Sequence, residues 1–128
     1  IAPNIDASII REIENLPRYT FCSVYAFARS NAQPEYRSAI AVIRTEHPDL
    51  MRTSCIHEEI AQGLGLPNDS PTARPSIFND DEEFALLTAH DELLLRVLYD
   101  PRLDIGMTPD EARPIVEAIA AELIDASS

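Results

Sequence analysis

Apolar residues recur every three or four positions in four stretches of the chain, and this spacing places them on one face of an α-helix. The four predicted helices cover about residues 6–16, 49–63, 88–98 and 108–125. In the second helix Ile56, Ile60 and Leu64 are each four residues apart, which predicts a single buried stripe along that helix. Gly65 follows, and glycine readily adopts the left-handed conformation that ends a helix.

Two further stretches, residues 19–29 and 36–45, alternate between the two sides of an extended chain and are rich in aromatic and β-branched side chains. The polar connection between them contains Pro34, so we expect the two strands to pair as an antiparallel hairpin. Two strands are marginal alone and need a covering helix or further strands. The pattern therefore predicts one α+β domain over residues 1–128, with a small antiparallel sheet packed on a central helix and two to three further helices.

Capping signals support the starts of the last two helices. Thr88 precedes Asp91 by three residues, which is the spacing of a capping box. The run Thr108-Pro109-Asp110-Glu111 combines a cap, a proline at the first helical position and an acid at the third. These two starts are the clearest local signals in the chain.

The charge of the chain narrows the classes of partner. It has 22 acidic and 10 basic residues, for a net charge of -12, and every basic residue is arginine. Such a surface repels nucleic acid and anionic lipids, whereas it tolerates cations or a basic protein. No apolar run approaches the roughly 20 residues of a membrane helix, so we expect no membrane span in this segment. The sequence begins at Ile1, and we interpret it as a mature or trimmed part of a longer chain.

The two cysteines, Cys22 and Cys55, fall in a predicted strand and a predicted helix. An even number of cysteines in ordered segments favours a disulfide and hence an oxidising compartment. We therefore expect an exported protein, periplasmic or secreted. Two buried free thiols are the alternative, and the distance between the Cα atoms decides between them.

The segment from Cys55 to Asp69 has the outline of a zinc-binding helix. A metzincin site carries histidines at its first, fifth and eleventh positions, with Glu second and Gly eighth. Aligning the glycine with Gly65 gives, in order, Glu58, Glu59, Gln62 and Asn68 at the first, second, fifth and eleventh positions. The segment thus resembles a degenerate metzincin in which the glutamate and the bend remain and all three histidines are replaced.

Later motifs extend the resemblance. The turn Ser76-Ile77-Phe78 resembles the Met-turn beneath the metal of metzincins, with Phe78 in place of the methionine. Residues 87–99 resemble the final helix of matrix-metalloprotease-like domains. Over nearly its full length the chain resembles the uncharacterised bacterial domain-of-unknown-function family 2927, through the phrases Cys-x-x-Glu-Glu, Leu-Gly-Leu-Pro-Asn-Asp, Ser-Ile-Phe-Asn-Asp and Leu-Tyr-Asp-Pro-Arg-Leu. The resemblance implies a zincin-like fold and carries no known activity.

The side chains at the degenerate positions offer only oxygen as a metal ligand. Glu58, Gln62, Asn68 and Asp69 would suit Ca²⁺, Mg²⁺ or Mn²⁺ better than Zn²⁺. Hard cations usually take six or more ligands and these residues supply at most four, so we expect no zinc and no other cofactor, while a weakly held cation stays open. The alternative is a hydrogen-bonded polar cluster. In either case we expect the bend at Gly65 to bring Asn68 back over Gln62 and Glu58.

The three histidines lack the paired spacing of metal ligands. His57 precedes Glu58, but the residue four positions on is Ala61. We interpret His57 as a surface or strand-facing residue, and His47 and His90 as surface residues.

Three functions are consistent with the sequence. The first is a non-catalytic zincin-like envelope module that binds a peptide or a partner protein through a protease-shaped groove. The second is a metal-independent or unusual-metal hydrolase with Glu59 as general base and Glu58 or Asp69 assisting, which requires burial to raise the pKa of a carboxyl group. The third is an accessory subunit of a larger envelope complex. The loss of all three zinc-ligand positions counts against an enzyme without excluding one.

Overall fold

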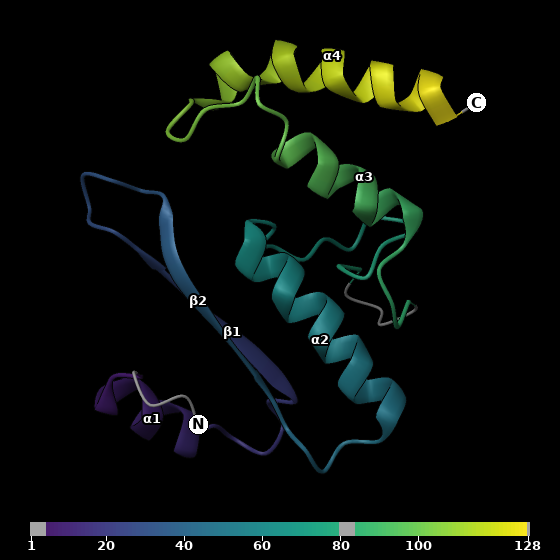
Figure 1. Ribbon diagram of the computed structural model, residues 1–128. Helices are drawn as coiled ribbons and strands as arrows, with labels where there is room; N and C mark the ends of the chain where they lie inside the picture. Colours follow the sequence, from purple (N-terminus) through teal and green to yellow (C-terminus); the bar gives the residue numbers. More distant parts are fainter. Residues whose placement is uncertain (1–4, 80–83, 128) are drawn as a thin grey trace.

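The computed structural model of the chain describes residues 5–79 and 84–127. These residues form an α+β structure with a two-stranded antiparallel sheet and four helices, as the periodicity predicted (Figure 1). In chain order the elements are α1 Ala7–Glu14, β1 Cys22–Ala28, β2 Tyr36–Ile43, α2 Asp49–Leu64, α3 Ala89–Leu98 and α4 Pro109–Ser127. No helix in this described part is long and apolar enough to cross a membrane.

The hairpin of β1 and β2 lies between α1 and α2 (Figure 1). Its strands are antiparallel, with Val24 opposite Ala41 and an irregularity in register between Phe27 and Ala28. Within the described residues each strand has one partner, so β1 and β2 each keep an outer edge that no other strand pairs. The segment after α1 is held to the sheet by Arg44, whose guanidinium donates to three backbone carbonyls between residues 16 and 20.

Helix α2 packs closely on the sheet. A Cβ atom at Gly63 would lie 3.2 Å from Val24 Cγ2 and 3.3 Å from Ala39 Cβ, so glycine permits this close approach. The Cα atoms of Cys22 and Cys55 lie 5.8 Å apart, which is within the usual range of a disulfide. The predicted pair is therefore at disulfide distance and connects β1 to α2.

The buried stripe predicted for α2 is wrong. Ile56, Ile60 and Leu64 are 43%, 50% and 44% exposed, whereas Glu59 and Ala61 are buried. The physical reason is that the sheet covers one side of α2 and the segment around residues 77 and 78 covers another. The isoleucines lie on a third side that neither covers, and helical periodicity alone does not show which side that is.

The core lies between α2, the turn at residues 76–79 and α3. Ala61, Ile77 and Phe78 form its buried cluster, and three partly buried leucines pack against it: Leu66, Leu87 and Leu95. Helix α4 packs on α3 at the end of the molecule away from α1, with Ile119 almost fully buried (Figure 1).

Both predicted helix starts are capped, and each has a capping box. In α3 the Thr88 hydroxyl accepts from the Asp91 N–H, and the Asp91 carboxylate accepts from the Thr88 N–H. In α4 Thr108 and Glu111 make the same reciprocal pair. Local sequence chemistry therefore sets where both of these helices begin.

Candidate functional site

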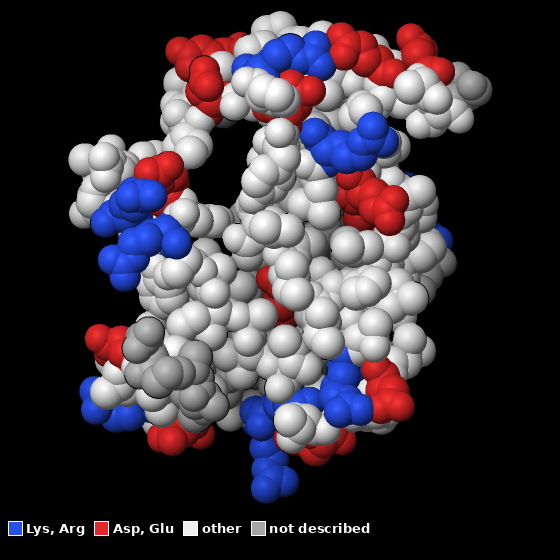
Figure 2. All heavy atoms as spheres, in the orientation of Figure 1, with Lys and Arg blue, Asp and Glu red and all other residues white. Residues whose placement is uncertain are grey.

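Two adjoining cavities lie along one side of α2, and we call them together the α2 groove. The first, the carboxylate cavity, has a volume of ≈ 320 Å³ and is lined by Cys22, Ser23, Val24, Ala26, Tyr36, Glu59, Gln62 and Pro67. The second, the apolar cavity, has a volume of ≈ 490 Å³ and is lined by Phe21, Cys22, Pro48, Leu50, Met51, Ser54, Cys55, Glu58, Asp69, Ile77, Asn79, Phe84 and Ala85. Figure 2 shows a face that is mostly uncharged at its centre, with acidic atoms at the bottom of a central hollow.

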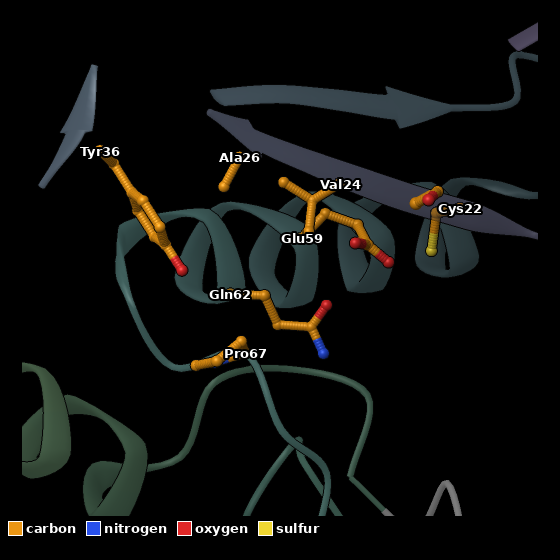
Figure 3. A pocket seen from close by; sticks show the side chains of 8 residues that line it. Cys22, Val24, Ala26, Tyr36, Glu59, Gln62 and Pro67 are labelled. Carbon is orange, nitrogen blue, oxygen red and sulfur yellow. The ribbon is translucent and has the colours of Figure 1, made fainter. Parts of the chain in front are cut away.

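The walls of the carboxylate cavity come from four segments (Figure 3). Val24 and Ala26 of β1 lie above α2, and Tyr36 of β2 stands at one end. Glu59 and Gln62 are three residues apart in α2, so their side chains extend from the same side of the helix. The loop after α2 closes the remaining side through Pro67.

Glu59 is a buried acid of the groove. Its side chain is only 6% exposed. Burial, followed by the negative charges of Glu58 and Asp69, raises the pKa of Glu59 to about 7. Within the described residues no hydrogen bond reaches its carboxylate. A carboxyl group that titrates near neutral pH can take up or release a proton under physiological conditions.

The loop after α2 returns to the helix through Asp69. Gly65 ends α2 with φ +128°, and Gln62 Nε2 then donates to Asp69 Oδ1 at 3.3 Å. The prediction gave this role to Asn68, which is exposed and lines neither cavity. The bend was expected correctly, but the side chain that reaches back, Asp69, lies one residue further along.

The turn at residues 76–78 borders the groove. Ser76, Ile77 and Phe78 are buried, and Ile77 also lines the apolar cavity. Asp91 holds this turn: its carboxylate accepts from the Ser76 hydroxyl, from the Ile77 N–H at 2.8 Å and from the Thr88 N–H at 3.0 Å. Burial raises the pKa of Asp91, but these hydrogen bonds outweigh it and hold the pKa below its usual value.

Asp91 is the residue whose importance the sequence understated. The capping-box spacing identified its bond to Thr88, which is local. Its bonds to Ser76 and Ile77 join positions 15 and 14 residues away in the chain, and no local pattern encodes them. Full burial of an acid at a helix start would have been the signal, and burial is a tertiary property.

Of the three histidines, His57 differs from its interpretation, while His47 and His90 are partly exposed. His57 is half-buried and accepts from the Leu87 N–H at 3.1 Å, so it contacts the segment before α3 and not the sheet. His47 Nε2 lies 2.9 Å from the carbonyl oxygen of Phe21, the residue just before β1. His90 is partly buried, and its Nδ1 has no hydrogen-bond partner.

The residues that line the groove fit a zinc ion poorly. Possible ligand atoms of Cys22, Glu58 and Glu59 lie within 4.8 Å of one another. The Cys22 sulfur is bonded to Cys55 and therefore supplies no thiolate. Two carboxylates remain, with Asp69 nearby, and such an all-oxygen set is short of the six ligands that hard cations usually take.

The described residues form a small α+β fold with a groove along α2 that is lined by acidic side chains. Residues 1–118 match the family described as "Protein of unknown function (DUF2927)", and the chain belongs to that family. No curated protein and no solved structure matches the chain.

Proposed function

We propose that this chain is a non-catalytic, zincin-like module that binds an extended peptide, or an extended segment of a partner protein, in the α2 groove. The observation that carries the proposal is the groove itself, which runs along α2 past the β1 wall through two cavities of ≈ 320 and ≈ 490 Å³. Cavities of this size accommodate side chains or small ligands.

The arrangement around the groove supports the comparison with a zincin. A strand lies beside the central helix, Gly65 bends the chain at the helix end, and the turn Ser76-Ile77-Phe78 packs beneath. At the positions where a zinc site requires histidine, α2 carries Glu58 and Gln62. The groove is open to an extended chain, while the histidines that a zinc site of this type requires are replaced.

Main-chain pairing supplies a binding mode that needs no metal. The outer edge of β1 is unpaired by any strand among the described residues, and an extended peptide can add to such an edge. Alternate side chains of the peptide would then point towards α2, and the two cavities would receive them.

The test is peptide binding measured by fluorescence anisotropy with a library of labelled, extended peptides. Ala26→Trp fills the carboxylate cavity from an exposed position on β1, and we expect it to weaken binding at least about tenfold. Ser38→Trp is the matched control, because Ser38 is exposed on β2 next to Ala39, which faces α2, and so points to the other side. Equal affinities for both variants and the wild type would contradict the proposal.

A hydrolase that uses Glu59 as general base is the second candidate, and the observation that favours it is the pKa of Glu59 at about 7 inside a cavity. Turnover of peptide or ester substrates that is abolished in Glu59→Gln would support it. Turnover that Glu59→Gln leaves unchanged would remove Glu59 from the chemistry.

A role as an accessory subunit in an exported complex is favoured by the exposed surface. The chain exposes 9027 Å², against roughly 6,800 Å² expected for a compact monomer of its mass. Part of this surface is the apolar stripe Ile56, Ile60 and Leu64. The disulfide Cys22–Cys55 supports a periplasmic or secreted location. Sizing chromatography that shows a stable, soluble monomer would count against the subunit role.

A further inference from the structure

Acidic side chains gather in the α2 groove. Its lining includes Glu58, Glu59 and Asp69, and among the described residues that line either cavity there is no lysine or arginine. Glu59 is 94% shielded from solvent, and the charged groups that act on it are both acids. Burying a carboxylate without a cation is unfavourable, so a positive charge that enters this cavity would gain a strong electrostatic interaction.

The cavity walls fit a long side chain better than a bare ion. Val24, Ala26 and Pro67 are apolar and border Glu59, and a volume of ≈ 320 Å³ far exceeds that of a metal ion (Figure 3). Lysine and arginine carry apolar stems that pack on such walls while the charged end reaches a carboxylate. The ring of Tyr36 at the cavity end offers a further contact for a guanidinium group.

We propose that the α2 groove selects basic peptides, with a lysine or arginine side chain entering the carboxylate cavity along β1 and its charge meeting Glu59. This inference rests on the proposed function, because it names the class of peptide that the groove binds. The net charge of -12 supports it independently, since it would accelerate association with a basic chain.

The proposal has a pH signature, because the carboxyl group must be ionised to bind a cation. The groups facing Glu59 are Glu58 from α2, Asp69 from the returning loop and the phenol of Tyr36 from β2, while β1 offers only the disulfide-bonded Cys22. Because burial raises the pKa of Glu59 to about 7, lowering the pH from 8 to 6 should weaken binding of an arginine peptide about tenfold.

The experiment compares arginine peptides with analogues in which citrulline replaces arginine. Citrulline has nearly the same shape and no charge, so the ratio of the two affinities isolates the ion pair. We expect a ratio of at least about ten at pH 8, and a ratio below about three for Glu59→Gln. Glu117→Gln is the control, because it removes the same charge from an exposed position on α4 and should leave the ratio unchanged.

Other outcomes overturn the proposal. The first is equal affinity for the arginine and citrulline peptides. The second is a wild-type affinity for the arginine peptide that does not change with pH. The third is an affinity ratio that falls as much in Glu117→Gln as in Glu59→Gln. Calorimetry with CaCl₂, MgCl₂ and ZnCl₂ adds one more outcome. If one of these ions binds the wild type but not Glu59→Gln, and the wild type does not prefer arginine peptides over citrulline peptides, the cavity is a site for that ion. Peptides that bind without preference refute this inference alone, whereas no peptide binding refutes the proposed function as well. If Glu59→Gln does not fold, the citrulline ratio and pH profile of the wild type decide.

Discussion

Replacement of Asp91 is the sharpest stability test of this structure. Its carboxylate is fully buried and accepts three hydrogen bonds, from the Ser76 hydroxyl and from the backbone N–H groups of Ile77 and Thr88. In Asp91→Ala all three donors lose their acceptor. Each loss of a bond to a buried charged group costs about 1–2 kcal/mol, so we expect the free energy of unfolding to fall by about 3–6 kcal/mol.

Asp91→Asn removes the negative charge of the side chain and keeps its shape, so it measures the contribution of the charge alone. The amide retains the size of the side chain and one oxygen acceptor, so we expect a smaller loss of about 1–3 kcal/mol. Glu92→Gln is the matched control, because Glu92 is an exposed acid in the same first turn of α3. It should change the free energy of unfolding by about 0.3–1 kcal/mol through the helix dipole alone. Urea denaturation followed by circular dichroism measures all three variants.

The pH dependence gives a second check. The pKa of Asp91 lies below its usual value in the folded state, so the folded protein binds the proton less tightly than the unfolded chain does. The stabilisation is therefore complete above the unfolded pKa of about 3.9 and is lost as pH falls through the folded pKa. The difference between wild type and Asp91→Asn should accordingly be large at pH 7 and shrink below about pH 4. A pH-independent difference, or equal effects of Asp91→Ala and Glu92→Gln, would refute the role of Asp91 in holding the turn.

Three further predictions concern the scaffold, and thermal or urea denaturation tests each of them. Gly65→Ala should cost about 2–3 kcal/mol, because φ is +128° and the new Cβ would lie 2.9 Å from Leu98 Cδ2; an unchanged midpoint would contradict this. Removing the Cys22–Cys55 link by double substitution to alanine should cost about 3.5–4 kcal/mol for a separation of 33 residues, and full stability without it would refute the assignment. Arg44→Ala should cost about 1.5–3 kcal/mol through its three backbone acceptors, with Arg37→Ala, an exposed arginine of the preceding strand β2, as a near-neutral control.

The features that the sequence predicted correctly are those that local chemistry determines. The hairpin follows from alternation and a polar connection, and the starts of α3 and α4 follow from the capping boxes at Thr88 and Thr108. The Cys22–Cys55 distance also agreed with the prediction, although it depended on the packing of a strand against a helix.

The features that the sequence missed depend on which surfaces meet. Periodicity identified Ile56 and Ile60 as one apolar side of α2, but the sheet and the turn cover other sides of that helix. In the candidate site the motif register selected Asn68, whereas the loop geometry brings Asp69 to Gln62. Spacing within a motif gives the order of side chains, and only the folded path of the loop shows which one returns to the helix.

The disulfide has a consequence for the groove as well as for stability. Cys22 lines both cavities and Cys55 lines the apolar one, so the crosslink joins the strand wall directly to the helix wall. The separation of the two walls is therefore limited covalently at the point where the cavities adjoin. A chain with reduced thiols would lack this limit, and its capacity to hold a ligand would depend on the oxidation state of its surroundings.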